Sequence, residues 1–188
     1  MDRSLANAVA GCGAAVVDGV FLRHASVARP GLAGGSAGGR WGPPGTYPVL
    51  YLGRPREAVV VEAYRRLVDP FPGMTGDMVS PRRVYTCGIR VTEVLDLRVA
   101  ANLAAVGLSG DALRGPYDPC QAVGQAAHQL GMHALIAPAA SGMGETLAMF
   151  MRHLGEGEQP EVLEEEVWET LPADPRRLRV IEGRGDRA

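Results

Sequence analysis

The chain has 188 residues, a net charge of −2 and a hydrophobic fraction of 46%, which together indicate one soluble globular domain with a substantial core. The near-neutral charge argues against a broad electrostatic surface for nucleic acid. All 19 residues counted as lysine or arginine are arginine, which excludes enzymes that depend on a Schiff-base lysine, a P-loop lysine or a Ser-Lys dyad.

The cysteines and the N-terminus bear on the cellular compartment. Cys12, Cys87 and Cys120 are odd in number and lack CxxC spacing, so we expect buried thiols in a reducing cytoplasm. Residues 9–12 have the form of a lipoprotein cleavage site, but the segment before them is too short to favour export. No run reaches the roughly 18 apolar residues that cross a bilayer. These features predict a cytoplasmic protein without membrane contact.

Apolar periodicity and turn residues predict strands and helices in mixed order along the chain. Pro55 in the first turn and an apolar face predict a helix over residues 54–69. Asp118 as N-cap, Pro119 and the stop signal Gly131 predict a second helix. The expected strands are 19–26, 47–53, 82–91, 93–98 and 132–140, with 146–154 as a strand or helix and 161–172 as a helix. Because no regular βαβ repeat is present, the predicted fold class is α+β.

A glycine-rich loop, "GGSAGGRWGPPG" over residues 34–45, contains one arginine and one tryptophan. Small residues around Arg40 leave its guanidinium few steric obstacles to a phosphate, and neighbouring backbone amides can assist. Two interpretations remain open: a loop that closes around a phosphorylated ligand, and an exposed loop arginine.

Two charged residues interrupt apolar segments. Glu62 follows three valines in the first predicted helix, where a buried carboxylate is costly unless it is paired or used. A solvated carboxylate paired with Arg66 at (i, i+4) is the alternative. Arg23 lies between Leu22 and His24 in the first strand, and a solvent-facing arginine is equally compatible with that position.

Tyr51 and Ser141 complete the candidate set. Tyr51 lies in the second strand, where a core tyrosine is the alternative to a ligand contact. Ser141 follows a strand and precedes Gly142, so it belongs either to a ligand-binding turn or to an ordinary ST-turn. The four histidines have no spacing typical of a metal site, so no metal is predicted. Two arginines, a tyrosine, a glutamate and a serine suit an anionic nucleotide.

In this order the motifs resemble those of the RES domain, the toxin component of bacterial RES–Xre toxin–antitoxin pairs. The motifs are Arg23, "GGRWGPPG" with Arg40, "PVLYLG" with Tyr51, "EA" with Glu62, "VLDL" at 94–97, and "CQAVGQAAHQLGMHALIAPAASGMG" at 120–144. They cover residues 20–150, and the "GGRW" and "CQAVG" stretches are similar to the mycobacterial NAD-degrading branch. The resemblance implies a single domain related to ADP-ribosyltransferases, with mixed sheets and flanking helices. It divides the chain into an N-terminal segment (1–18), a RES domain (19–153) and an extension (154–188) that packs on the domain or extends it.

The resemblance also implies roles for particular residues. Glu62 would stabilise the oxocarbenium-like charge on the ribose, while Arg23 and Arg40 would bind the diphosphate. The implied catalytic residues are Glu62, Arg23 and Ser141, and the implied NAD-binding residues are Arg40, Tyr51, His24, Trp41 and Gly144. His24 stands where the family often has a tyrosine, which affects rate or substrate choice.

The implied activity is cleavage of NAD at its nicotinamide–ribose bond, with water or inorganic phosphate as acceptor. NAD is then a substrate, and no cofactor is expected. The implied partner is an Xre-type antitoxin whose C-terminal segment blocks the site, in a homodimer or hetero-oligomer without direct nucleic-acid contact. Two alternatives remain open: transfer of ADP-ribose to a protein, and a nucleotide-binding module without turnover.

Overall fold

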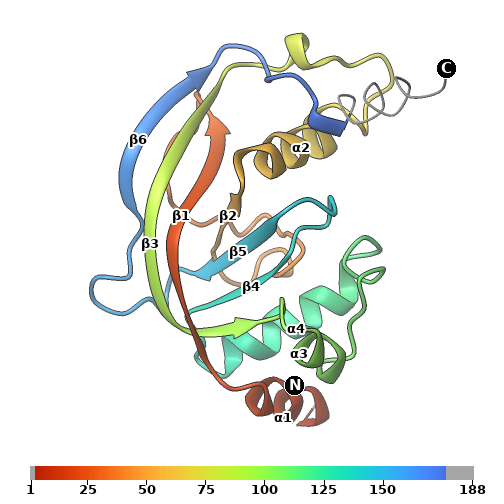
Figure 1. Cartoon of the computed structure of the whole chain (residues 1–188), viewed down its shortest axis with the longest axis vertical. Coiled ribbons are helices and arrows are strands. Elements are labelled where there is room, and N and C mark those ends of the chain that lie inside the picture. The colour runs from red at the N-terminus through yellow and green to blue at the C-terminus, as the bar shows by residue number, and fades with distance from the viewer. Residues whose placement is uncertain (1–2, 177–188) are drawn as a thin grey trace, which may run out of the picture.

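The computed structural model describes residues 3–176, and its helices lie at the two ends of a curved sheet (Figure 1). The helices are α1 (Arg3–Gly11), α2 (Arg56–Leu67), α3 (Ala100–Ala105) and α4 (Asp118–Gln129), with a 3-10 turn at Gly76–Met78. The strands are β1 (Ala15–Ser26), β2 (Val49–Arg54), β3 (Arg82–Asp96), β4 (Ala134–Pro138), β5 (Glu145–Phe150) and β6 (Glu161–Trp168).

The strands form one sheet in the order β1-β2-β5-β4-β3-β6, and a further pairing of β1 with β3 closes the first five strands into a barrel-like ring. The pairing of β3 with β4 is parallel, whereas the other ladders are antiparallel. β6 is added to β3 outside the ring, so β1, β3 and β6 run side by side as long curved strands (Figure 1). Closure leaves few free strand edges in the ring. The α+β class and the single mixed domain are confirmed.

Alternating side chains of β2 and β5 divide the core in two. Leu50 and Leu147 point into the ring, where they pack with Phe21 of β1. Val49 and Ala148 point the other way, onto the cluster that α4 covers. This alternation is the period-2 pattern of a strand that is buried on both faces.

Helix α2 covers a third cluster near the opposite end of the molecule from α1, α3 and α4 (Figure 1). Val59, Val60 and Ala63 of α2 pack against Val84 of β3 and Trp168 of β6. The predicted helix over residues 54–69 is therefore confirmed, and its apolar face lies where the periodicity placed it.

Three sequence predictions about β-structure are wrong in detail. The two strands predicted over residues 82–91 and 93–98 form one strand, β3, which ends at Asp96 and in which Glu93 has φ +50°. The helix predicted over residues 161–172 is wrong, because residues 161–168 form β6. The spacing of Leu163 and Val167 is typical of one face of a helix. The segment forms a strand because its backbone pairs with the edge of β3, a contact that local periodicity does not predict. β1 begins at Ala15, before the predicted boundary at residue 19.

The helical predictions need smaller corrections. The N-cap of α4 is Tyr117 and not Asp118, which lies in the first turn of the helix. The N-cap side chain forms no capping hydrogen bond. The sequence pattern did not predict the helices α1 and α3. Cys87 and Cys120 are buried as expected, while Cys12 is half-buried. Residues 177–188 of the predicted extension lie outside the described residues. Within residues 3–176, no helix has the length and apolar character needed to span a membrane.

Candidate active site

The glycine-rich loop folds back over Tyr51 of β2. A Cβ atom added at Gly39 would lie 2.6 Å from the Tyr51 hydroxyl, so this position requires glycine's missing side chain. The backbone N–H of Trp41 donates to the Tyr51 hydroxyl at 3.0 Å. The Trp41 side chain is 2% exposed, so it anchors the loop in the core, and its contribution to the site comes from its backbone.

Arg40 is held between the loop and the N-terminus of α4. Its Nη1 donates to the Gly115 carbonyl at 3.2 Å, and its guanidinium lies 4.6 Å from the centroid of the Tyr117 ring. Gln121 of α4 donates to the Gly39 carbonyl at 2.9 Å. Among the described residues, no carboxylate lies within ion-pair distance of Arg40. The cation is therefore oriented by neutral groups and is available to an anion.

Gly124 explains how α4 approaches this loop. A Cβ atom at Gly124 would lie 2.2 Å from the Trp41 carbonyl oxygen. A glycine within a helix costs about 1 kcal/mol relative to alanine, so its presence in "CQAVGQ" is a sequence signal of close backbone approach. The sequence analysis did not identify Tyr117 and Gln121, which contact the Arg40 loop. The signal for this contact in the sequence is Gly124, because a glycine within a helix indicates that another segment packs closely against it.

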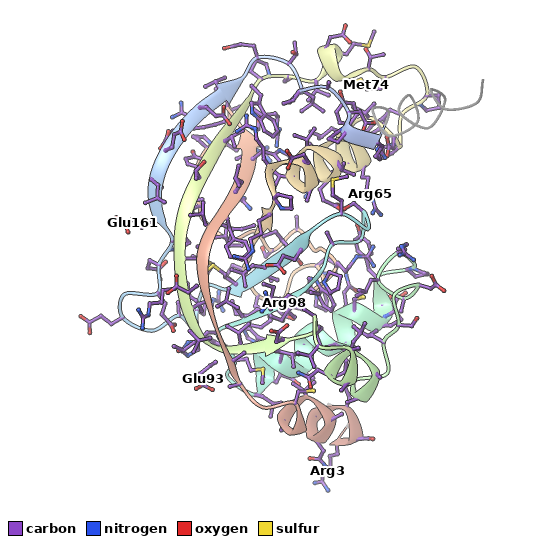
Figure 2. The ribbon with its side chains drawn as sticks, in the orientation of Figure 1. Arg3, Arg65, Met74, Glu93, Arg98 and Glu161 are labelled. Carbon is purple, nitrogen blue, oxygen red and sulfur yellow. The ribbon has the colours of Figure 1, made fainter. Side chains whose placement is uncertain are left out.

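Glu62 lies in the middle of α2 and reaches the turn that follows β4. The backbone N–H of Ser141 donates to Glu62 Oε1 at 3.1 Å. Arg65 Nη1 lies 3.7 Å from the same oxygen, and the carboxylate side chain is 40% exposed. Figure 2 shows Arg65 between α2 and the hairpin of β4 and β5. The carboxylate therefore pairs with Arg65 rather than with Arg66, and it is held at the serine turn.

The serine turn is fixed by its own hydrogen bonds and by its glycines. Ser141 Oγ lies 3.3 Å from both the Met143 carbonyl and the Met143 N–H. Gly142 and Gly144 have φ values of +76° and +69°, which favour glycine. A Cβ atom at Gly144 would lie 2.1 Å from the Arg54 carbonyl oxygen, so this glycine packs the turn against the end of β2.

Arg23 points from β1 toward β2. Its Nη1 donates to the Tyr51 carbonyl at 3.3 Å and its Nε to the Gly31 carbonyl at 3.4 Å. Burial lowers the pKa of Arg23, and the charge of Arg66 lowers it further. Arg23 stays protonated at neutral pH, but its charge has no carboxylate partner among the described residues. An anionic ligand would relieve that cost.

His24 is adjacent to Arg23 in sequence but contacts a different group of residues. Arg82 Nε donates to His24 Nδ1 at 3.2 Å, so the ring proton of the neutral imidazole lies on Nε2. The ring stacks on Trp168 with centroids 6.2 Å apart. Burial, together with the charges of Arg82, Arg23 and Arg66, lowers the pKa of His24 to about 3. His24 is therefore a neutral hydrogen-bonding group, and Arg82 is a contact that sequence reasoning missed.

Tyr51 contacts both the loop that carries Arg40 and the side chain of Arg23. Burial raises its pKa to about 12, so the phenol is neutral at physiological pH. Its hydroxyl accepts from Trp41 and keeps its own proton for a further hydrogen bond. Its carbonyl accepts from Arg23. Hydrogen bonds therefore connect Arg23 and the Arg40 loop through Tyr51. A separate hydrogen bond connects Glu62 to Ser141. His24 belongs to neither set, because its hydrogen bond is to Arg82.

Comparisons with known proteins relate this chain to a family of known fold. The family model described as "RES domain" matches residues 19–173, a range that includes β6. NAD(+) phosphorylase MbcT from Mycobacterium bovis and from Mycobacterium tuberculosis is 32% identical over 140 residues, which cover 72% of this chain and 75% of the relative. A crystal structure of the M. tuberculosis MbcT-MbcA toxin-antitoxin complex contains a chain that superimposes with a TM-score of 0.81 and 28% identity, covering 89% of this chain and 93% of that one.

The family match spans most of the described residues, and the relatives retain both the fold and about a third of the sequence. The ordered motifs and their places in the fold agree with that match. This chain belongs to the RES domain family.

Proposed function

We propose that this protein degrades NAD by breaking the bond between nicotinamide and ribose, and that it acts as the toxin of a toxin–antitoxin pair. The observation that carries the proposal is the position of Glu62. Its carboxylate accepts a hydrogen bond from the Ser141 N–H, and one turn later the same helix presents Arg66, whose charge lowers the pKa of Arg23. The named activity of the relative MbcT, NAD(+) phosphorylase, supports the same reaction.

The chemistry requires a negative charge near the sugar. As the bond from C1 of the ribose to the nicotinamide nitrogen breaks, its electron pair leaves with nicotinamide, which departs neutral, and positive charge develops on the ribose. A carboxylate stabilises that charge and orients the attacking nucleophile. We assign this role to Glu62, and its hydrogen bond from the Ser141 N–H supports the assignment by orienting the carboxylate.

The acceptor completes the reaction. Attack by a phosphate oxygen forms a C1–O bond and yields ADP-ribose 1-phosphate, whereas attack by water yields ADP-ribose and releases a proton. The name of MbcT favours phosphate. Arg23 and Arg40 bind the diphosphate of NAD, and Tyr51 packs against the nicotinamide or its ribose. Ser141 orients Glu62 through its backbone N–H, and His24, Trp41 and Gly144 support the surrounding segments.

The proposed partner is an antitoxin, because the structural relative was solved in a toxin-antitoxin complex. An Xre-type antitoxin that blocks the site with its C-terminal segment would keep the enzyme inactive until the antitoxin is lost. The proposed location is the cytoplasm, where NAD is available and where the unpaired thiols stay reduced.

Incubation of the purified protein with NAD, with and without inorganic phosphate, tests the reaction. We expect release of nicotinamide, with ADP-ribose 1-phosphate formed when phosphate is present, as measured by chromatography and mass spectrometry. NAD that stays intact under both conditions would exclude the proposal. ADP-ribose attached to cellular proteins after induction, without free product, would instead favour protein modification.

A further inference from the structure

Tyr117, at the start of α4, contacts Arg40 through the face of its ring. The Arg40 Cζ atom lies over this ring, 4.6 Å from the ring centroid, which is the geometry of a cation–π interaction. Tyr117 is 50% exposed, and among the described residues the core cluster that α4 covers does not include it. Its side chain therefore contributes to the surroundings of Arg40 more than to the hydrophobic core.

The contacts of Arg40 leave one edge of its guanidinium without a protein partner. Nη1 donates to the Gly115 carbonyl at 3.2 Å and lies 3.9 Å from Cys120 Sγ, while Tyr117 covers one face of the planar group. Within residues 3–176, Nε and Nη2 form no hydrogen bond. A pair of neighbouring guanidinium nitrogens is the arrangement that binds two phosphate oxygens at once. Tyr117 and Gly115 thus occupy the parts of the guanidinium that a bidentate phosphate does not need.

The first turn of α4 places the Tyr117 ring. Tyr117 is the N-cap, its carbonyl accepts from the Gln121 N–H at 2.8 Å, and its side chain forms no capping hydrogen bond. The Gln121 side chain donates to the carbonyl of Gly39, the residue before Arg40, at 2.9 Å. The helix therefore holds the loop backbone through one residue and the guanidinium through another. Because the Tyr117 side chain caps nothing and is half exposed, its replacement should leave α4 and the fold intact.

We propose that Tyr117 is a positioning residue that holds the Arg40 guanidinium with Nε and Nη2 directed at the diphosphate of NAD. This role rests on the proposed function, because it takes the dinucleotide as the ligand of Arg40. A long arginine side chain loses rotamer freedom when it binds a phosphate, and a ring contact that exists before the ligand arrives reduces that cost. The contact becomes stronger when the bound dinucleotide excludes water from it.

The expected effect is on the binding of NAD and not on bond cleavage. The cation–π contact is present before and after NAD binds, so its loss raises KM and leaves kcat nearly unchanged. Y117L, which keeps an apolar side chain but removes the aromatic face, should raise the KM for NAD by about fivefold. Y117F keeps the face, and Q125A changes an exposed residue of the same helix, so both should stay within about twofold of the wild type. Equal KM values for Y117F and Y117L would overturn the proposal.

A double-mutant cycle tests whether Tyr117 acts through Arg40. In the R40Q background the guanidinium is absent, so the addition of Y117L should not change the KM for NAD further. A general structural role of the ring would raise the KM in both backgrounds, as would a direct contact between the ring and NAD. An increase of about fivefold in both backgrounds would therefore overturn the positioning role.

Binding of ADP-ribose separates this role from the reaction, because ADP-ribose contains the diphosphate but not the bond that is cleaved. In calorimetry, Y117L should bind ADP-ribose about fivefold more weakly than the wild type and Y117F, and Y117L should have no effect in the R40Q background. Equal affinities of the wild type and Y117L would overturn the positioning role alone. A wild type that binds ADP-ribose with the expected coupling but leaves NAD intact would overturn only the proposed reaction.

Discussion

Two groups of arginines in this protein differ in whether carboxylates of the protein balance their charge. Near the hairpin of β4 and β5, Arg98 binds Asp96 at 2.7 Å and Glu145 at 3.2 Å, and Arg54 pairs with the same Glu145. Figure 2 labels Arg98 beside these strands. Hydrogen bonding to Asp96 raises the pKa of Arg98, and Arg98 in turn lowers the pKa of Asp96. These charges stabilise one another and tie β2, β3 and β5 together.

The group around Arg23 and Arg82 has no such compensation. Burial lowers the pKa of both arginines, and the neighbouring cation Arg66 lowers it again. The comparison teaches that arginine content alone does not indicate a role. A cation that pairs with a carboxylate of the protein stabilises the fold, whereas we propose that a half-buried cation without such a partner binds a ligand. Four tests examine this distinction and the site around it.

The largest expected effect is the loss of activity in E62Q. The amide keeps the shape of the side chain and removes the charge that we propose stabilises the ribose cation, so the rate of nicotinamide release should fall by about 10³-fold. The fold should persist, because the carboxylate is 40% exposed. E57Q, at an exposed position in the first turn of the same helix, is the control. Full activity in E62Q would remove the basis of the proposed mechanism.

The second test compares one arginine from each group, Arg23 and Arg98. R23Q should lower kcat/KM for NAD by about 10²-fold or more and leave the free energy of unfolding unchanged or increased, because it removes an uncompensated charge. R98Q should do the reverse, with a loss of about 1 kcal/mol in urea unfolding and nearly unchanged kcat/KM. A loss of stability in R23Q equal to that in R98Q would contradict the distinction between the groups.

The third test concerns the loop that presents Arg40. In G39A the added methyl group would lie 2.6 Å from the Tyr51 hydroxyl, so the loop must move away from β2. We expect kcat/KM to fall by about tenfold and stability by about 1–3 kcal/mol. At Gly35 a Cβ atom would meet nothing within 4 Å, so G35A is the matched control. Similar behaviour of the two variants would show that the loop does not depend on close contact with Tyr51.

The smallest expected effect is a pH dependence of stability from His24. Its pKa is lowered from 6.5 to about 3, so between these values the unfolded chain binds a proton that the folded chain does not. Stability therefore rises with pH in this window and is lost as the pH falls. Between pH 7.5 and 5.5 the wild type should lose about 1 kcal/mol more than H24Q in urea unfolding. Equal losses in the two proteins would show that folding does not lower the pKa of His24.

Local features of the sequence predict much of the fold. Pro55 and an apolar face predict helix α2, and Pro119 and Gly131 predict α4, because helix boundaries and faces depend on residues within one or two turns. The ordered motifs also indicate the RES family and single out Glu62 and Ser141, which lie in contact. The absence of lysine by itself excludes the classes of enzyme that need its amine as nucleophile, base or phosphate ligand.

The tertiary structure decided what depends on distant residues. The segment Glu161–Trp168 has helical spacing but forms a strand, because β3 presents a long edge whose backbone groups need partners. Likewise, neither Arg66 nor Arg82 differs by local pattern from the other arginines. Only the packing of α2 near the ends of β1 and β3 brings the charge of Arg66 close enough to lower the pKa of Arg23 and of Arg82. Local sequence determines how a segment prefers to fold, whereas pairing across the sheet and the balance of charge arise from contacts between segments far apart in the chain.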